Sequence, residues 1–264
     1  SGLSRMLKNL IGKLMRIEMD QKVPLIPLFW PWTDAERRVL DTREFLQSRS
    51  FTLVYLSGII TIWATLGFGH WGSLRCESLG EQLACSSAIW PNKLVDAPHE
   101  FLLSFFTSPW FHNDYPHIKF VIISFAIFTQ SFEAKAGSKS TAILFFGTIA
   151  ITSIGAAIIF NTGAHFWPEN ETFTHPMSRS WMGGSIGLMG ILGAHSHHSR
   201  QKWLIPAILL SFEYWNREYN GISEYITWGH LSSALVGFIL WGFYLKQYTP
   251  ASTVEKNKPI APEG

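Results

Sequence analysis

Long apolar stretches without charged residues dominate the middle of this chain. Residues 51–74 contain no Asp, Glu, Lys or Arg over 24 positions, and residues 141–168 contain none over 28. The hydrocarbon core of a bilayer is about 30 Å thick, and about 20 apolar residues in a helix cross it. Each stretch is therefore long enough to span a membrane, and the pattern predicts an integral membrane protein.

The apolar positions divide into six segments, separated by polar connections. The segments are 51–68, 116–132, 141–160, 181–194, 203–212 and 225–244. They predict an all-α membrane protein built as a bundle of six transmembrane helices. Residues 1–50 are predicted to form a cytoplasmic N-terminal segment and 51–247 the membrane domain. Residues 248–264, rich in Lys, Pro and Glu, are predicted to form a disordered C-terminal tail.

The positive charges are distributed unevenly between the two sides of this predicted bundle. The chain has 21 Lys and Arg, and the connections on one side hold only Arg75, Lys93, Arg179 and Arg217. Nearly all the others lie in the termini and in the connections on the opposite side. The positive-inside bias therefore predicts that both termini are cytoplasmic. The net charge of +2 indicates neither nucleic acid nor an acidic substrate as a partner.

Residues 3–19 have an amphipathic pattern with basic side chains on the polar side. Arg5, Lys8, Lys13 and Arg16 lie on that side, and no acidic residue precedes Glu18. The pattern predicts a basic helix on the cytoplasmic membrane surface. The remnant of a mitochondrial-type presequence fits the same composition. The chain is thus expected to be multi-pass, in the plasma membrane or an organelle membrane.

The chain has two cysteines, Cys76 and Cys85, which are too few for a disulfide framework. Both fall in one connection on the predicted outer side. A single bridge can form there if that side faces an oxidising compartment.

The segment 181–194 is unusually short for a transmembrane helix. Its 14 residues, at 1.5 Å of rise each, do not cross the bilayer. The segment opens with Gly183-Gly184-Ser185. A helix that begins below the membrane surface exposes N–H groups that lipid cannot satisfy. This helix end is therefore expected to line a wet cavity inside the protein, where a polar reaction can proceed.

Rows of small residues predict that segment 181–194 packs against segment 225–244. The rows are Gly183, Gly187, Gly190 and Ala194 on the first segment, and Gly229, Ser233 and Gly237 on the second. This packing brings Ser185 into the same layer as His230. A serine hydroxyl becomes an effective nucleophile when a neighbouring base takes its proton, and a helix N-terminus favours an oxyanion. Ser185 is therefore the candidate nucleophile and His230 its candidate base.

The two segments resemble the catalytic segments of the rhomboid intramembrane serine proteases. In the rhomboid nucleophile segment, glycines follow the serine after five and eight residues, as Gly190 and Gly193 do here. His230, with Leu231 and Gly237, resembles the signature of the last rhomboid helix.

Two further matches lie upstream, around the second predicted helix. His112 and His117 resemble the His-x-x-x-x-His at its start, and Glu133 and Gly137 resemble the Glu-x-x-x-Gly that closes it. The four matches occur in the family's order and together cover about residues 51–244.

The resemblance implies a rhomboid-like bundle and a serine endopeptidase that cleaves transmembrane segments of membrane proteins within the lipid bilayer. It implies that Ser185 attacks the scissile carbonyl and that His230 is general base and then general acid, without a carboxylate partner. His117 and the Ser185 backbone N–H are implied to hold the oxyanion. His112 and Gly183 are implied to support the cavity. The reaction needs no metal and no other cofactor.

The sequence departs from the rhomboid pattern at several positions. Val121 stands where the family usually has an oxyanion-donating Asn, and Ile186 replaces the glycine after the nucleophile. Met189 replaces an aromatic residue, and Leu-Ser-Ser follows His230 in place of Leu-Gly-Gly. These departures motivate an alternative hypothesis: a catalytically weak or inactive rhomboid-like protein that binds client helices or serves as a membrane-complex subunit.

Two other enzyme classes fit the sequence less well. A histidine-box di-metal oxygenase would need to combine His112, His117, His195, His197, His198 and His230, which the predicted topology distributes over both membrane sides. The literal Gly-x-Ser-x-Gly of residues 183–187 belongs, in soluble hydrolases, between a strand and a helix. Its flanks here are predicted membrane helices.

Overall fold

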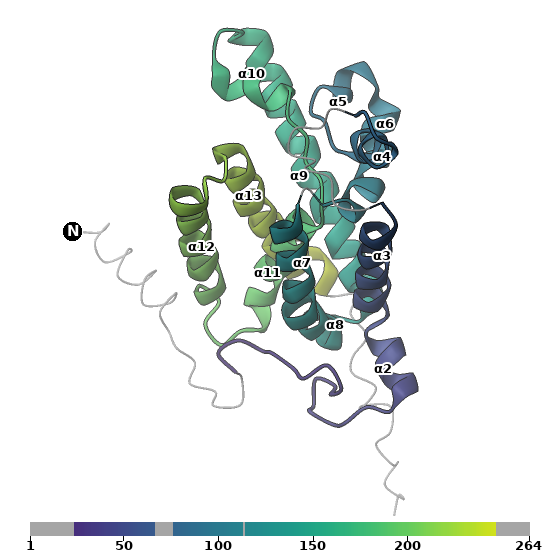
Figure 1. Cartoon of the computed structure of the whole chain (residues 1–264). Helices are drawn as coiled ribbons and strands as arrows, with labels where there is room; N and C mark the ends of the chain where they lie inside the picture. Colours follow the sequence, from purple (N-terminus) through teal and green to yellow (C-terminus); the bar gives the residue numbers. More distant parts are fainter. Residues whose placement is uncertain (1–23, 67–75, 113, 247–264) are drawn as a thin grey trace, which may run out of the picture.

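The computed structural model describes residues 24–66, 76–112 and 114–246 of the chain. Within these ranges the regular structure is helical, and strand-like pairing is limited to isolated bridges between Thr33 and Val39 and between Ile89 and Trp181. The predicted helix over residues 3–19 and the predicted tail 248–264 lie outside the described residues. Figure 1 shows the long helices side by side, with α4, α5, α6 and α10 at one end and α2 at the other.

Each of the six predicted apolar segments contains a helix over its described residues. They correspond to α3 (Ser50–Leu66), α7 (Tyr115–Ser124) continued by η3 (Phe125–Thr129) and α8 (Gln130–Ala136), α9 (Ser138–Phe166), α11 (Ser185–His195), α12 (Leu204–Asn220), and α13 (Glu224–Leu240) continued by η5 (Trp241–Leu245). The elements η3 and η5 are π-helical turns. The shorter helices are α2 (Thr42–Ser48), α4 (Leu79–Ser87), α5 (Lys93–Asp96), α6 (Pro98–Thr107) and α10 (Glu171–Met177).

Two of the described helices are long and apolar enough to cross a membrane on their own. They are α9, with 29 residues, and the continuous helix of α13 and η5, with 22. The helices α2 and α3 are bent by 79° at their junction and make a third candidate if they form one span. The chain is thus all-helical over its described residues, with two to three candidate spans by length and composition.

Large apolar side chains are exposed along the outer faces of the long helices, and their contact with water would be energetically unfavourable. They include Ile143, Ile151, Ile158 and Ile159 on α9, Ile208, Leu210 and Trp215 on α12, and Trp228, Leu235 and Ile239 on α13. Contiguous exposed apolar surface of this kind marks contact with a membrane or a partner. The outer faces therefore suit a lipid environment.

The junction between α8 and α9 explains the Glu-x-x-x-Gly motif. Gly137 has φ of +80°, a conformation that glycine adopts without steric cost, and it ends α8. Glu133, one turn earlier and 1% exposed, accepts hydrogen bonds from the backbone N–H groups of Phe51 and Thr52, at 2.8 and 3.0 Å. These donors belong to the first turn of α3, which has no intrahelical acceptors for them. The motif therefore anchors the start of α3 to the bundle.

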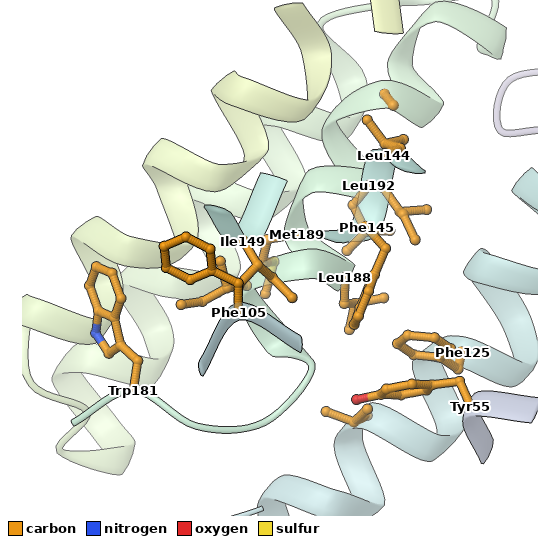
Figure 2. Packing of buried hydrophobic residues seen from close by; sticks show 14 of the residues in the cluster. Tyr55, Phe105, Phe125, Leu144, Phe145, Ile149, Trp181, Leu188, Met189 and Leu192 are labelled. Carbon is orange, nitrogen blue, oxygen red and sulfur yellow. The ribbon is translucent and has the colours of Figure 1, made fainter. Parts of the chain in front are cut away.

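Helix α11 is the centre of the bundle, and every residue from Ser185 to His195 is buried. It packs against α13, α9, η3, α12 and α7. Figure 2 shows Leu188 and Met189 of α11 beside the large apolar side chains of α9, such as Phe145. Eleven residues span about 16 Å, which is too short to cross a bilayer. The first and last residues, Ser185 and His195, are both buried, so both ends of α11 lie inside the protein. The polar start of this helix is enclosed by protein rather than by lipid.

The glycines of α11 divide between two neighbours, which differs from the single predicted row. A Cβ on Gly187 would overlap Phe145 of α9, whereas one on Gly193 would overlap the backbone of Ala234 on α13. Gly190 adjoins both helices, because a Cβ on Gly237 of α13 would overlap its carbonyl and a Cβ on Gly190 itself would overlap Thr148 of α9. The predicted packing of α11 on α13 is present, but Gly190 and Gly193 provide it.

Cys76 and Cys85 are joined by a disulfide bond immediately before and within α4. Ser78 caps this helix: its side chain accepts from the Glu81 backbone N–H. The bridge that the sequence allowed is therefore formed, at the end of the molecule that carries α4, α5, α6 and α10 (Figure 1).

Candidate active site

The segment that leads into α11 fixes the position of Ser185. The N–H and C=O of Trp181 pair with those of Ile89 at 2.9 Å, and the Gly183 N–H donates to the Ser108 carbonyl, also at 2.9 Å. Gly183 has φ of +91°, which directs the chain sharply into the helix. Helix α11 then begins at Ser185, four residues after the predicted start. Ser185 is thereby held at the end of α11 that faces α4 and α6.

The structure brings Ser185 and His230 together. The Ser185 Oγ lies 3.1 Å from the His230 Nε2, although 45 positions separate the residues in sequence. Both side chains are almost fully buried, with 5% and 8% exposure. The close approach follows from the packing of α11 on α13, because the contact of Gly190 with Gly237 lets the two backbones meet without intervening side chains.

His112, His117 and Gly183 also lie at the start of α11. The rings of the two histidines are 5.1 Å apart between centroids, in an edge-to-face arrangement. A Cβ on Gly183 would lie 2.6 Å from His117 Cε1 and 3.2 Å from His112 Cδ2. Gly183 is therefore a glycine for two reasons: its backbone conformation and the close approach of both rings. The predicted support residues therefore lie together beside the chain that leads into Ser185.

His112 interacts with the backbone just before Ser185. Its Nε2 accepts from the Gly184 N–H at 3.4 Å. Burial lowers the pKa of His112 well below its ordinary value, and the nearby His117 lowers it further. The lone pair on Nε2 accepts this hydrogen bond, which helps to hold the loop of residues 183–184.

The first turn of α11 has the properties of an anion site. The leading N–H groups of a helix have no intrahelical acceptors, and the helix dipole places partial positive charge there. The capping residue is Gly184, which has no side chain that could accept from these N–H groups. The Ser185 backbone N–H is therefore suited to stabilise negative charge that develops beside the Ser185 hydroxyl.

A carboxylate that sequence reasoning missed completes the arrangement. Glu213 Oε1 lies 2.8 Å from His230 Nδ1, on the side of the ring opposite Ser185. Glu213 is 1% exposed and belongs to α12. The sequence predicted a fifth segment that stops at residue 212, so Glu213 was assigned to a connection. The resemblance implied no carboxylate partner for His230, and the structure corrects that expectation.

Three other histidines of the oxygenase hypothesis, His195, His197 and His198, lie at the opposite end of α11 from Ser185. His195 ends α11, ten residues from Ser185, and its ring is 6.0 Å from that of His198 between centroids. Over the described ranges, no three His, Cys, Asp or Glu side chains are placed to hold a metal ion. The six histidines of the oxygenase hypothesis therefore do not converge.

Comparison with known proteins identifies one family. The family model described as the rhomboid domain matches residues 99–247, more than half of the chain. The match includes Ser185, His230, Glu213, His112 and His117. Searches of curated proteins and of solved structures gave no significant match.

Proposed function

Because the chain belongs to the rhomboid family, we propose that it is a serine endopeptidase that cleaves transmembrane segments of membrane proteins inside the bilayer. The observation that carries this proposal is the 3.1 Å contact between Ser185 Oγ and His230 Nε2. A hydroxyl and an imidazole at this distance are the minimum needed for nucleophilic catalysis by serine. The family is generally one of intramembrane serine proteases, and this chain has kept both groups.

In the proposed first half-reaction, Ser185 Oγ attacks the scissile carbonyl carbon while its proton passes to His230 Nε2. The carbonyl oxygen becomes an oxyanion, held by the Ser185 backbone N–H and by His117. The intermediate collapses as the C–N bond breaks, and the proton on Nε2 passes to the departing amine. The product is an acyl-enzyme on Ser185 and a new amino terminus. No metal or other cofactor takes part.

In the second half-reaction, a water molecule gives a proton to His230 Nε2 and attacks the acyl carbon. The second tetrahedral intermediate collapses when the proton returns to Ser185 Oγ, which releases the new carboxyl terminus. Water must reach Ser185 for this step, and the neighbouring polar side chains of His112 and His117 are proposed to line its route. These residues are proposed to support the cavity.

We further propose that the six helical segments all cross or enter the membrane, with both termini cytoplasmic. The uneven distribution of Lys and Arg supports this orientation. The disulfide between Cys76 and Cys85 supports it as well, because such bonds persist in oxidising compartments. Trp181 pairs with Ile89, close to α4, so Ser185 is nearer to the end of the molecule that carries the disulfide. The proposed cleavage site then lies toward the outer side.

Val121 and Ile186 favour a second candidate function, that of a rhomboid-like protein that binds client helices without cleaving them. Both side chains are buried, at 0% and 6% exposure, and neither can donate a hydrogen bond to an oxyanion. The loss of one donor typically lowers turnover by about 10²–10³-fold. A binding protein would tolerate that loss.

A fluorophosphonate probe distinguishes the two functions, because it reacts only with an activated serine. The wild-type protein in detergent is expected to be labelled, and Ser185→Ala is expected to lose the label while keeping its thermal stability. Ser232→Ala, which removes the hydroxyl of an exposed serine on α13, is the control and is expected to retain labelling. Failure to label folded wild type would favour the binding function.

Val121→Asn is expected to raise turnover, by up to about 10²-fold. Val121 follows His117 by one helical turn on α7, so an Asn amide there projects from the same face as the proposed oxyanion donor. The measurement is kcat for a transmembrane substrate, with Val121→Ala as a control that changes packing but supplies no donor. Unchanged turnover in folded Val121→Asn would mean that another group already fills this role.

A further inference from the structure

The carboxylate of Glu213 has a position that the two-residue mechanism does not use. Its Oε1 lies 2.8 Å from His230 Nδ1, while its Oε2 is buried without a hydrogen-bond partner. The basic residue of the same helix, Arg217, is directed elsewhere and pairs with Glu224. In the structure, Glu213 is thus a buried acid whose polar contact is the ring of the catalytic base.

We propose that Glu213 is a positioning residue that converts the Ser185–His230 pair into a Ser–His–Glu triad. This inference rests on the proposed function. It departs from the family resemblance, which implies a catalytic pair without a carboxylate. Glu213 does not touch the substrate in this account and acts only through His230.

The first consequence of the contact concerns the tautomer of His230. An ionised carboxylate has no proton to donate, so the hydrogen bond requires a proton on His230 Nδ1. The neutral ring then has its lone pair on Nε2, the nitrogen that faces the Ser185 hydroxyl. This is the tautomer that can accept the serine proton. Without the carboxylate, neither tautomer is selected by a partner at Nδ1.

The second consequence concerns charge. A buried carboxylate is costly when its neighbour is neutral, because the protein interior solvates it poorly. When Ser185 attacks, His230 gains a proton and becomes an imidazolium directly beside Glu213. The pair is then charge-compensated, so the carboxylate stabilises the transition state more than the resting state. Interactions of this kind raise kcat rather than substrate affinity.

The third consequence concerns substitution by glutamine, which has nearly the same shape. Its amide NH₂ can donate to Nδ1, which places the ring proton on Nε2 and removes the acceptor that Ser185 needs. In proteases with a Ser–His–Asp triad, the corresponding change from acid to amide leaves the geometry intact and lowers turnover about 10⁴-fold. Glu213→Gln is therefore expected to fold and to turn over slowly.

The experiment compares wild type, Glu213→Gln and Glu218→Gln in liposomes with a transmembrane substrate. Glu218 is an exposed carboxylate on the same helix, which makes it the matched control. Glu213→Gln is expected to lower kcat by about 10²–10⁴-fold with KM within threefold of wild type. Glu218→Gln is expected to leave both constants unchanged. A purely structural role for Glu213 would instead lower thermal stability and leave the kcat of the folded fraction intact.

A spectroscopic readout keeps the test independent of catalysis. In protein with ¹⁵N-labelled histidine, the His230 signals, assigned by their loss in His230→Ala, are expected to show Nδ1 protonated and Nε2 unprotonated. In Glu213→Gln this assignment is expected to reverse. If wild type cleaves substrate but Glu213→Gln retains wild-type kcat and tautomer, the triad is overturned and the proposed function survives. If folded wild type cleaves nothing and takes no probe, the proposed function fails, whatever the tautomer.

Should Glu213→Gln fail to fold, the wild-type spectrum alone decides the question. A wild-type His230 with its proton on Nε2 overturns the triad, and one with its proton on Nδ1 supports it. Glu213→Asp supplies a second variant, which keeps the charge but shortens the side chain by one methylene. It is expected to retain the wild-type tautomer and to be faster than Glu213→Gln, a rescue that a role in packing volume does not predict.

Discussion

Replacing His230 with alanine is expected to lower kcat for cleavage of a transmembrane substrate on the order of 10⁶-fold, as removal of the base does in serine proteases. Ser185 would then have no acceptor for its proton, because the structure gives its hydroxyl the His230 Nε2 as partner at 3.1 Å. KM is expected to change little, because His230 is buried and contacts Ser185 rather than the substrate. It contributes when it accepts the proton in the transition state. The measurement is single-turnover cleavage in detergent, which keeps a very slow reaction visible.

His99→Ala is the matched control for that variant. His99 is an exposed histidine in the first turn of α6, far from the start of α11 in sequence. It is expected to cleave at the wild-type rate. Retention of more than a tenth of the wild-type rate by folded His230→Ala would contradict the role of His230 as the base.

Gly237→Ala is expected to reduce both stability and turnover. A Cβ at this position would overlap the backbone carbonyl of Gly190, so α11 and α13 must move apart. Overpacking of this kind costs about 1–3 kcal/mol in the free energy of unfolding. The displacement also separates Ser185 from His230, and a misplacement of about 1 Å lowers turnover by about 10²-fold. Thermal unfolding and kcat, measured on the same preparation, test the two effects together.

Gly155→Ala makes the same chemical change where the structure leaves room. Gly155 lies in α9, and no heavy atom outside its own helix lies within 4 Å of the added Cβ. Alanine has a higher helix propensity than glycine. This control is therefore expected to be as stable as wild type, or more stable by up to about 1 kcal/mol. Equal behaviour of the Gly155 and Gly237 variants would show that the contact of α11 with α13 does not position the site.

The helices were largely predictable because apolar runs in a membrane protein must satisfy their backbone groups internally. Residues 141–160 and 225–244 coincide with the cores of α9 and α13. Boundaries were less predictable where the apolar signal ended before the helix did. The second helical segment continues through the π-helical turn η3 to the end of α8. Its charged residue Glu133 accepts a hydrogen bond from the Phe51 N–H at the start of α3.

The pairing of Ser185 with His230 could be predicted from sequence because small residues indicated which helices approach closely. The detailed assignment of each glycine was not accessible, since several small residues on α11 compete for two neighbouring helices. Gly187 was placed in the row facing the last helix, but Phe145 of α9 occupies that space. The contact partner depends on the rotation of α11, which the sequence pattern does not determine.

Glu213 shows most clearly where reasoning from hydropathy fails. A charged residue after an apolar run usually marks the end of a membrane helix, so the fifth segment was ended one residue too early to include it. Helix α12 continues to Asn220, and Glu213 lies on its inner face, at 1% exposure. Its position is favourable only because His230, 17 residues further along, directs Nδ1 toward it. A contact between helices is not encoded in the pattern of one segment.

The most direct test of the proposed protease is cleavage by the purified protein in liposomes that contain a single transmembrane substrate, followed by mass spectrometry of the products. Wild type is expected to give two fragments whose summed mass exceeds that of the substrate by one water, and Ser185→Ala is expected to give none. Identical fragments from Ser185→Ala, or an intact substrate after prolonged incubation with folded wild type, would contradict the assignment of Ser185 as the nucleophile of an intramembrane protease.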